Sequence, residues 1–131
     1  MLDQLFVKNL VVVQELNIEF KNGMTVVTGE TGAGKSILID ALMLALGGRA
    51  DASVIREGAS KADIAAEFTG EFDAAVLTWL DEHEFVSEDG QLLLRRVIDS
   101  SGRSKAFING ITATVTQLRE IGEILVDIHG Q

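Results

Sequence analysis

Apolar and polar residues alternate along residues 16–20 and 64–72, and this alternation predicts two strands that each bury one face. The stretch at residues 5–13 is also rich in strand-forming residues, with Lys8-Asn9 as the expected break. Residues 24–28 are short, apolar and partly β-branched, a pattern typical of a central strand that is buried on both faces. The first part of the chain therefore predicts a sheet.

One segment without helix breakers, residues 35–46, is apolar nearly all round. It predicts a helix that is buried on most sides and is ended by Gly47-Gly48. Asp73 is a suitable N-terminal cap for a second, shorter helix that reaches about Glu82.

Residues 92–98 and 104–108 predict a hairpin, and Asn109-Gly110 supplies the turn that follows it. The hairpin carries the basic residues Arg95, Arg96, Arg103 and Lys105. The chain has 11 basic and 20 acidic residues, a net charge of −9, which makes it a poor stand-alone DNA binder. A nucleic-acid role would need such a local basic patch, although a charged hairpin face is more often only solvated.

The end of the chain predicts a short helix and a last strand. The helix begins at Thr114 or Thr116 and reaches about Ile121, and residues 124–128 are apolar and strand-like. The 131 residues fit one α/β domain, with a strand, loop and helix at its centre and mixed or antiparallel strands around them.

Composition narrows the possible chemistry. There are no cysteines, which excludes disulfides and thiolate chemistry, and the two histidines, His83 and His129, are too few for a zinc cluster. Trp79 and the six phenylalanines are expected in the core rather than in a base-stacking platform. The longest apolar run is half the length of a bilayer span and no secretory signal is evident, so a cytoplasmic protein without membrane contact is expected.

The clearest motif has the pattern of a phosphate-binding loop, G-x-x-x-x-G-K-[ST]. It reads Gly29, Glu30, Thr31, Gly32, Ala33, Gly34, Lys35 and Ser36. Glycines let main-chain N–H groups converge on a phosphate, and the following helix points its positive end at the same anion. Lys35 is expected to reach the β- and γ-phosphates, and Ser36 to offer its hydroxyl to Mg²⁺. The competing interpretation is that the glycines only form a tight turn. It is disfavoured because the whole pattern rarely arises by chance in a chain of this length, and because the loop lies between a predicted buried strand and a helix without breakers.

Other site residues are open to two interpretations. Asp127, after the apolar run at residues 124–126, is either a Mg²⁺ ligand or a strand-end residue, in which case Gln131 is the polar group aimed at metal or attacking water. Arg49 and Arg56 follow the predicted P-loop helix, and each is either a phosphate contact or a solvated surface arginine.

Several segments together resemble the N-terminal part of the RecN family of bacterial DNA double-strand-break repair ATPases, which are of the structural-maintenance-of-chromosomes (SMC) type. The segments are LFVKNL (5–10), GETGAGKSILIDAL (29–42), LGGRAD (46–51), RSKAFING (103–110) and LVDIHGQ (125–131). The resemblance covers essentially the whole chain and implies the P-loop NTPase fold, as the first lobe of an ABC-type ATPase head.

The resemblance also implies roles for individual residues. Residues 29–36 would be the Walker A loop that binds ATP with Mg²⁺, and Gln131 the Q-loop glutamine near the metal and the γ-phosphate. Arg49 would face a phosphate, and Lys8 and Asn9 would lie near the nucleotide. These assignments favour Asp127 as a strand-end residue.

In that family a coiled coil and a second lobe follow, and the second lobe carries the signature motif, the Walker B acid and the catalytic glutamate. Two heads then sandwich ATP, and the whole protein acts on DNA at the nucleoid. We therefore expect residues 1–131 to bind nucleotide but to hydrolyse little. The alternatives are a small P-loop kinase that phosphorylates a metabolite, a nucleotide-gated interaction module without chemistry, and a transporter ATPase.

Overall fold

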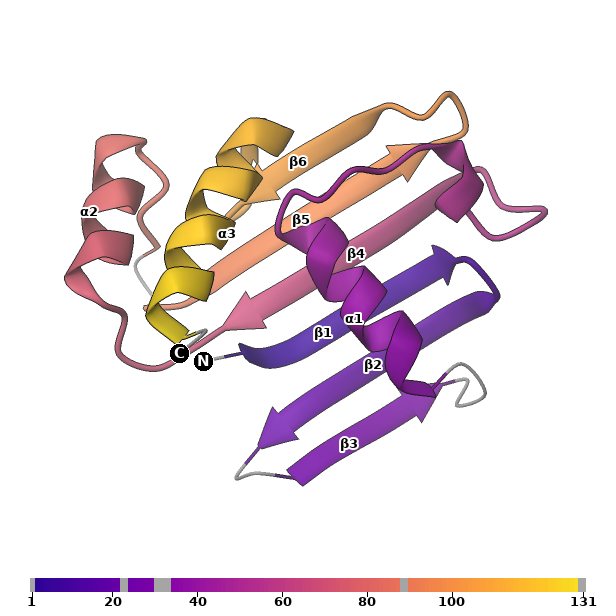
Figure 1. The fold of residues 1–131 in the computed structure, drawn as a ribbon, viewed down its shortest axis with the longest axis horizontal. Helices are drawn as coiled ribbons and strands as arrows, with labels where there is room; N and C mark the ends of the chain where they lie inside the picture. Colours follow the sequence, from indigo (N-terminus) through magenta and orange to yellow (C-terminus); the bar gives the residue numbers. More distant parts are fainter. Residues whose placement is uncertain (1, 22–23, 30–33, 88–89, 130–131) are drawn as a thin grey trace.

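The computed structural model describes residues 2–21, 24–29, 34–87 and 90–129. Its centre is a seven-stranded sheet with the order β3-β2-β1-β4-β5-β6-β7 (Figure 1). Every neighbouring pair is antiparallel. The strands are β1 (Leu2–Leu10), β2 (Val13–Lys21), β3 (Met24–Gly29), β4 (Lys61–Phe68), β5 (Leu92–Asp99), β6 (Ser104–Ile108) and β7 (Ile111–Ala113).

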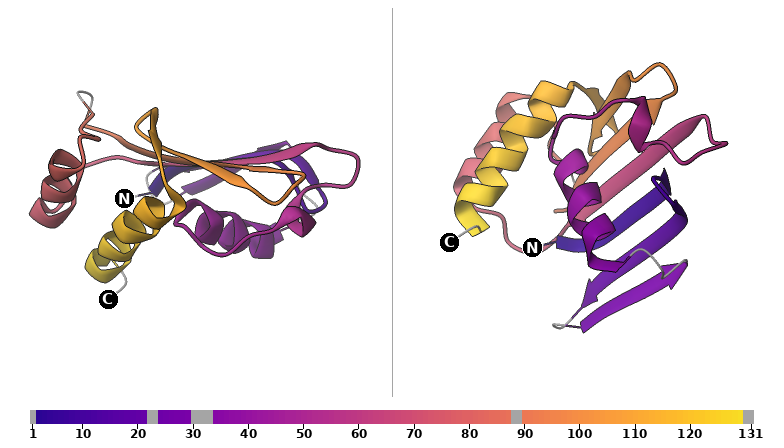
Figure 2. Two further views of the ribbon diagram at one scale, coloured as in Figure 1. Left: turned by 90° about the horizontal axis from the view of Figure 1, so that it is seen from above. Right: turned by 45° about the vertical axis from the view of Figure 1, so that its right-hand side comes forward.

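The helices lie to one side of this sheet, as Figure 2 shows. They are α1 (Gly34–Ala45), α2 (Ala74–Glu82) and α3 (Val115–His129), with a short 3-10 helix, η1 (Ala52–Val54), after α1. α1 contacts β1, β4 and β5, whereas α3 contacts β6 and α2. The core lies between α1, α3 and the covered sheet face, and the opposite face carries no helix of the described chain.

Alternation along the strands produces this one-sided burial. In β4 and β5, every second side chain is buried, so that residues such as Ile64 and Leu94 pack beneath the helices while their neighbours face outward. In β1, Leu5 and Val7 are fully buried, but Phe6 between them is 44% exposed. The expectation that all phenylalanines lie in the core is therefore wrong for Phe6.

Both predicted helix caps are present. The Asp73 carboxylate accepts a hydrogen bond from the Ala75 N–H at 3.2 Å, at the start of α2. At the start of α3, Thr114 Oγ1 accepts from the Gln117 N–H and Gln117 Oε1 accepts from the Thr114 N–H, both at 3.0 Å. This reciprocal pair is a capping box, which fixes the first turn of α3.

The predicted core position of Trp79 is confirmed. Its side chain is 8% exposed, its ring stacks on His83 with centroids 4.1 Å apart, and its Nε1–H donates to Glu120 on α3 at 3.2 Å. His83 is half-buried in this stack. These contacts tie α2 to α3.

The predicted last strand is wrong, because residues 124–128 belong to α3. The buried positions Leu118, Ile121 and Leu125 recur every three or four residues, which is the stripe of an amphipathic helix. The apolar run at residues 124–126 was too short to separate a strand from a helix by itself. Both interpretations of Asp127 placed it at the end of a strand, and that placement is wrong, because its backbone lies in α3. Its side chain lies outside the described residues.

Three further expectations need correction. β1 continues through Lys8-Asn9, and the chain turns at Val11-Val12 instead. β3 is not central but is an edge strand of the sheet formed by the described residues. α1 is not buried on most sides, since Ile39 and Met43 are 61% and 58% exposed. The apolar residues of β3 and α1 thus indicate that these elements have surfaces to bury. They do not indicate which other element buries them.

In the described part of the chain, no helix is both long enough and apolar enough to cross a membrane.

Gly47 and Gly58 make a matched test of the packing after α1. Both have positive φ, 90° and 88°, but a Cβ at Gly47 would lie 2.6 Å from the Arg119 backbone nitrogen, whereas the space around Gly58 is open. We expect Gly58→Ala to lower the free energy of unfolding by about 1 kcal/mol through backbone strain alone. Gly47→Ala should cost about 1–3 kcal/mol more, because α3 must shift.

Urea unfolding followed by circular dichroism measures both variants. Equal losses for Gly47→Ala and Gly58→Ala would contradict the close approach of α3 to the segment after α1.

Candidate nucleotide-binding site

The predicted phosphate loop lies between a strand and a helix, as its motif requires. β3 ends at Gly29 and α1 begins at Gly34, so the loop joins the carboxyl end of a strand to the amino end of a helix. The first turn of α1 contains no acidic residue that would oppose an anion. The helix end is therefore suited to a phosphate group.

Several predicted site residues lie outside what the structure describes. Glu30, Thr31, Gly32, Ala33 and Gln131 belong to this group as whole residues. For Lys35 and Ser36 the backbone lies in the first turn of α1, and their side chains are outside the described residues. Their roles stay predictions.

One end of the sheet gathers the other candidates. β1 ends, β2 begins and β3 ends at the same end of the sheet, with Leu10 opposite Val13 and Leu16 opposite Gly29 (Figure 1). The segment after η1 lies beside this end of the sheet, because the Arg56 N–H donates to the Asn9 carbonyl at 2.8 Å. The backbones of Arg56 and Asn9 are thus at the sheet end from which the phosphate loop departs.

Arg49 is exposed and lines a hollow of about 310 Å³ beside α1. The hollow is bounded by Asp40 on α1, by Val11 in the β1–β2 turn and by Val54 on η1. The Val11 N–H donates to the Val54 carbonyl at 2.7 Å, which fixes the far wall. Arg49 therefore lies between the P-loop helix and the sheet end just described.

Arg96 is a buried residue whose contact with α1 the sequence did not indicate. It is 3% exposed, although the hairpin pattern placed it in a surface patch. Its Nη1–H donates to the Leu44 carbonyl at 3.0 Å and to the Gly48 carbonyl, and its Nε–H donates to Ser104 Oγ at 3.0 Å. Arg96 thus joins the end of α1 to β5 and β6 by donating to one carbonyl in the last turn of the helix and to one in the segment that follows it.

The buried position of Arg96 disfavours the positive charge of its guanidinium. Burial lowers the pKa of its guanidinium, and the positive charge of Arg119 lowers that pKa further. The three hydrogen-bond acceptors compensate for the lost hydration. The only sequence signal for this role was the alternation of β5. It places Arg96 on the sheet face that the helices cover and Arg95 on the face that no described helix covers, here called the open face.

The predicted basic patch of four residues loses Arg96, because that side chain is buried. Arg95 lies on the open sheet face and pairs with Asp63 through hydrogen bonds of 3.0 and 2.6 Å. This pairing raises the pKa of the Arg95 guanidinium. Arg103 and Lys105 are exposed as predicted.

Comparison with known proteins places this strand–loop–helix arrangement in a class. The family model described as "AAA domain" matches residues 4–128, nearly the whole chain. The chain belongs to the AAA domain family.

The particular relatives are DNA repair proteins named RecN. The chain is 47% identical over 131 residues to RecN of Vibrio cholerae and 44% identical over 131 residues to RecN of Bacillus subtilis. Each match covers 100% of this chain but only 24% and 23% of the relative, so the chain spans about a quarter of the length of these proteins. The resemblance stated from the sequence motifs is confirmed.

Solved structures support the fold. A structure titled "Structural biochemistry of ATP-driven dimerization and DNA stimulated activation of SMC ATPases" is 25% identical, with a TM-score of 0.66, and the match covers 92% of this chain and 76% of that one. An SMC head bound to the C-terminal winged-helix domain of ScpA gives a TM-score of 0.61 at 21% identity, covering 92% of this chain and 39% of that one. The predicted P-loop NTPase fold of the ABC-type head is confirmed.

Replacing Arg96 tests its structural role. Arg96→Met keeps much of the side-chain length but leaves the Leu44 and Gly48 carbonyls and the Ser104 hydroxyl without this donor. We expect the free energy of unfolding to fall by about 2–4 kcal/mol. Arg95→Met is the matched control, because it removes an exposed ion pair and should cost less than about 1 kcal/mol.

Denaturant titration of the two variants measures the difference. An Arg96→Met protein as stable as the Arg95→Met protein would contradict the role of Arg96 in holding α1.

Proposed function

We propose that residues 1–131 form the nucleotide-binding N-terminal lobe of a RecN-like DNA repair ATPase. The observation that carries this proposal is the G-x-x-x-x-G-K-S sequence between the end of β3 and the start of α1. Strong similarity to RecN proteins over the whole chain supports the DNA-repair assignment, and the SMC ATPase likeness supports ATP as the nucleotide.

The nucleotide contacts follow from the chemistry of the loop. Main-chain N–H groups of residues 29–34 and the positive end of α1 would hold the phosphates, and Lys35 would add a point charge at the β- and γ-phosphates. Ser36 and Gln131 would be the Mg²⁺ contacts from this chain, with waters and phosphate oxygens completing the ion's shell. When bound, the magnesium nucleotide supplies the phosphoryl group and neutralises part of its charge.

Three further residues are proposed around this site. Arg49 would contact a phosphate from the hollow beside α1, and Lys8 and Asn9 would lie near the rest of the nucleotide. Their support is the clustering of Asn9, Arg49 and the β1–β2 turn near one sheet end.

The lobe needs a covering partner. β3 has one strand neighbour among the described residues, and α1 leaves Ile39 and Met43 mostly exposed. A C-terminal lobe of the same protein would cover these surfaces, and a second head would join in an ATP-dependent dimer that acts on DNA in the nucleoid.

Hydrolysis would depend on that partner. The one candidate for a Mg²⁺-binding acid after an apolar strand was Asp127, and its backbone is helical. A metabolite kinase is not supported, since residues 61–113 supply strands β4 to β7 and the short helix α2 where a kinase needs a lid and an acceptor pocket.

Nucleotide binding is the direct test. We expect isothermal titration calorimetry of residues 1–131 with Mg²⁺ to show binding of ATP and ADP, and Lys35→Ala to weaken that binding about tenfold or more by removing a charge-assisted contact. Arg103→Ala is the control, since it removes an exposed positive charge from the turn between β5 and β6. A folded wild-type chain that takes up neither nucleotide would refute the proposal.

Turnover is the second test. We expect residues 1–131 alone to release phosphate from ATP at no more than the rate of the Lys35→Ala protein, because the strands of the described residues offer no Walker B acid after an apolar run. Sustained ATPase activity that Lys35→Ala abolishes would show that a catalytic base lies within this lobe.

A further inference from the structure

The helix α2 is attached to the lobe mainly through one other helix. Residues 69–73 separate it from β4 and residues 83–91 separate it from β5, although these two strands are neighbours in the sheet. Of the described elements, α3 is the one that α2 contacts most. Figures 1 and 2 show α3 between α2 and α1. The contact between α2 and α3 therefore decides how firmly α2 is held.

Three side chains meet between these helices, here called the clasp: Trp79 on α2, His83 directly after it and Glu120 on α3. The indole and imidazole rings stack with their planes 22° apart. Glu120 Oε1 accepts the Trp79 Nε1–H at 3.2 Å and lies 3.9 Å from His83 Nε2. One carboxylate oxygen thus faces both rings.

The hydrogen bonds of His83 determine where its first proton lies. His83 Nδ1 is 2.8 Å from the Trp79 carbonyl oxygen. A carbonyl oxygen can only accept a hydrogen bond, so Nδ1 carries a hydrogen. In the neutral imidazole, Nε2 then presents a lone pair to the Glu120 carboxylate, and this pairing is repulsive. A proton on Nε2 turns it into an attraction between an imidazolium and a carboxylate.

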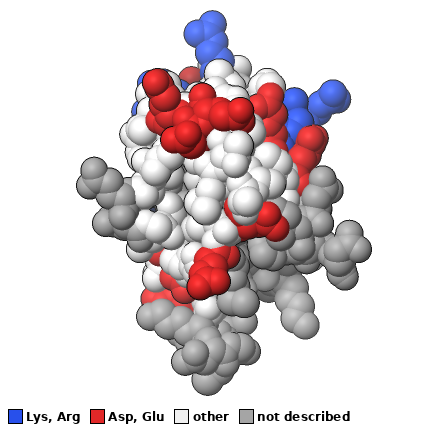
Figure 3. Space-filling view, turned by 90° about the vertical axis from the view of Figure 1, so that its left-hand side faces the viewer, with Lys and Arg blue, Asp and Glu red and all other residues white. Residues whose placement is uncertain are grey.

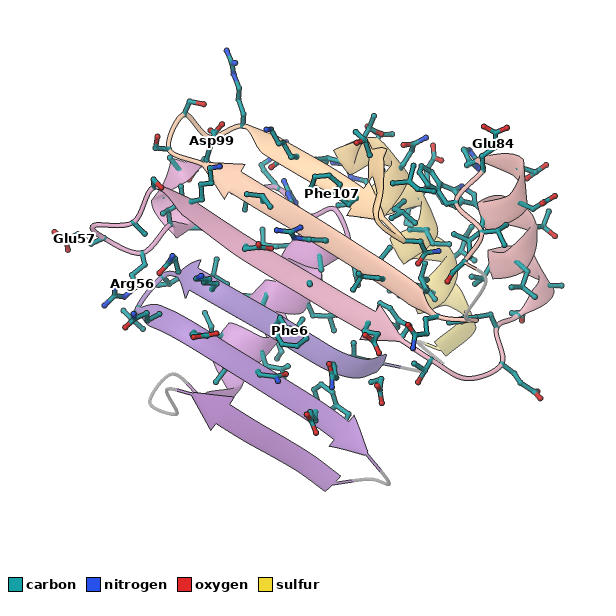
Figure 4. All side chains as sticks on the ribbon, turned by 180° about the vertical axis from the view of Figure 1, so that it is seen from behind. Phe6, Arg56, Glu57, Glu84, Asp99 and Phe107 are labelled. Atoms are coloured by element: carbon teal, nitrogen blue, oxygen red, sulfur yellow. The ribbon has the colours of Figure 1, made fainter. Side chains whose placement is uncertain are left out.

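The charged groups around the clasp favour the same proton. Among the described residues, His83 is the one basic side chain within 4.0 Å of the Glu120 carboxylate. The Arg119 guanidinium donates to the Gly47 carbonyl, on the side of α3 that faces α1. Figure 3 shows acidic side chains spread over the end of the molecule that α2 forms, and Glu84 projects from that end (Figure 4). The exposed acids of α2, of the turn after it and of the next turn of α3 are Asp81, Glu82, Glu84 and Glu123.

We propose that the clasp is a proton-sensitive joint, which closes α2 onto α3 when His83 is protonated and loosens when His83 is neutral. In the closed form the imidazolium donates to the Trp79 carbonyl and to Glu120, and it lies against the face of the indole, which attracts a cation. Loosening would uncover apolar side chains of α2, because Val76 and Leu80 are buried.

The direction of the pH dependence follows from these partners. The unfolded chain offers neither the carboxylate nor the stacked indole, so the folded lobe holds the proton better than the unfolded chain does. The stabilisation by the clasp is therefore fully present when the pH lies below the range in which a free imidazole titrates, about 6.5, and it is lost as the pH rises above that range. The phosphate loop takes no part, since it departs from the end of β3, away from α2 (Figure 1).

A pH titration of residues 1–131, followed by the indole N–H resonance of Trp79 in proton–nitrogen correlation spectra, tests the joint. We expect this resonance to move as the pH falls from about 8 to about 5.5, because the imidazolium draws on the oxygen that the indole N–H shares. His83→Gln should abolish the movement. His129→Gln is the matched control, since it removes the other histidine and leaves the clasp intact.

Urea unfolding measures whether the proton stabilises the fold. We expect the midpoint of the wild-type chain to rise more, or to fall less, between about pH 8 and about pH 6 than the midpoints of His83→Gln and Glu120→Gln. Glu120→Gln keeps an oxygen for the indole N–H and removes only the charge. A wild-type resonance that does not move with pH would overturn the proposal. The same follows if His83→Gln leaves the movement unchanged, or if neither variant alters the pH dependence of the midpoint.

Discussion

The structure depends on how α1 is fixed across the sheet. A helix of 12 residues is a rigid rod about 18 Å long, so the position of its amino end follows from how its carboxyl end is held. Arg96 holds that end by donating to two carbonyls after and within the last turn, and Ser104 orients the guanidinium. The amino end of α1, which follows the predicted phosphate loop in the sequence, is therefore positioned by a contact at the opposite end of the helix.

A second constraint is the one-sided sheet. Helices cover one face, and the alternation of β1, β4 and β5 sends one residue to the core and the next to the open face. Arg95 and Arg96 are neighbours in sequence and serve these two faces separately. The alternation thus lets the same strand contribute to the core through one residue and to the helix-free face through the next.

Much of the fold was predictable because it depends on local chemistry. The hairpin of β5 and β6, the Asp73 and Thr114 caps and the strand–loop–helix context of the P-loop all follow from residue types at fixed spacings. The errors share a different cause. The edge position of β3, the exposed side of α1 and the buried state of Arg96 depend on which elements become neighbours in space, and the short apolar run at residues 124–126 fits two periodicities.

Trp79 has a practical consequence. It is the only tryptophan, and there is no tyrosine, so nearly all intrinsic fluorescence comes from one indole stacked on His83 and bonded to Glu120. That indole joins α2 to α3, away from the sheet end where the phosphate loop begins. Its emission therefore reports whether α2 and α3 remain packed together. A variant that loses nucleotide binding but keeps this emission has kept the α2–α3 contact.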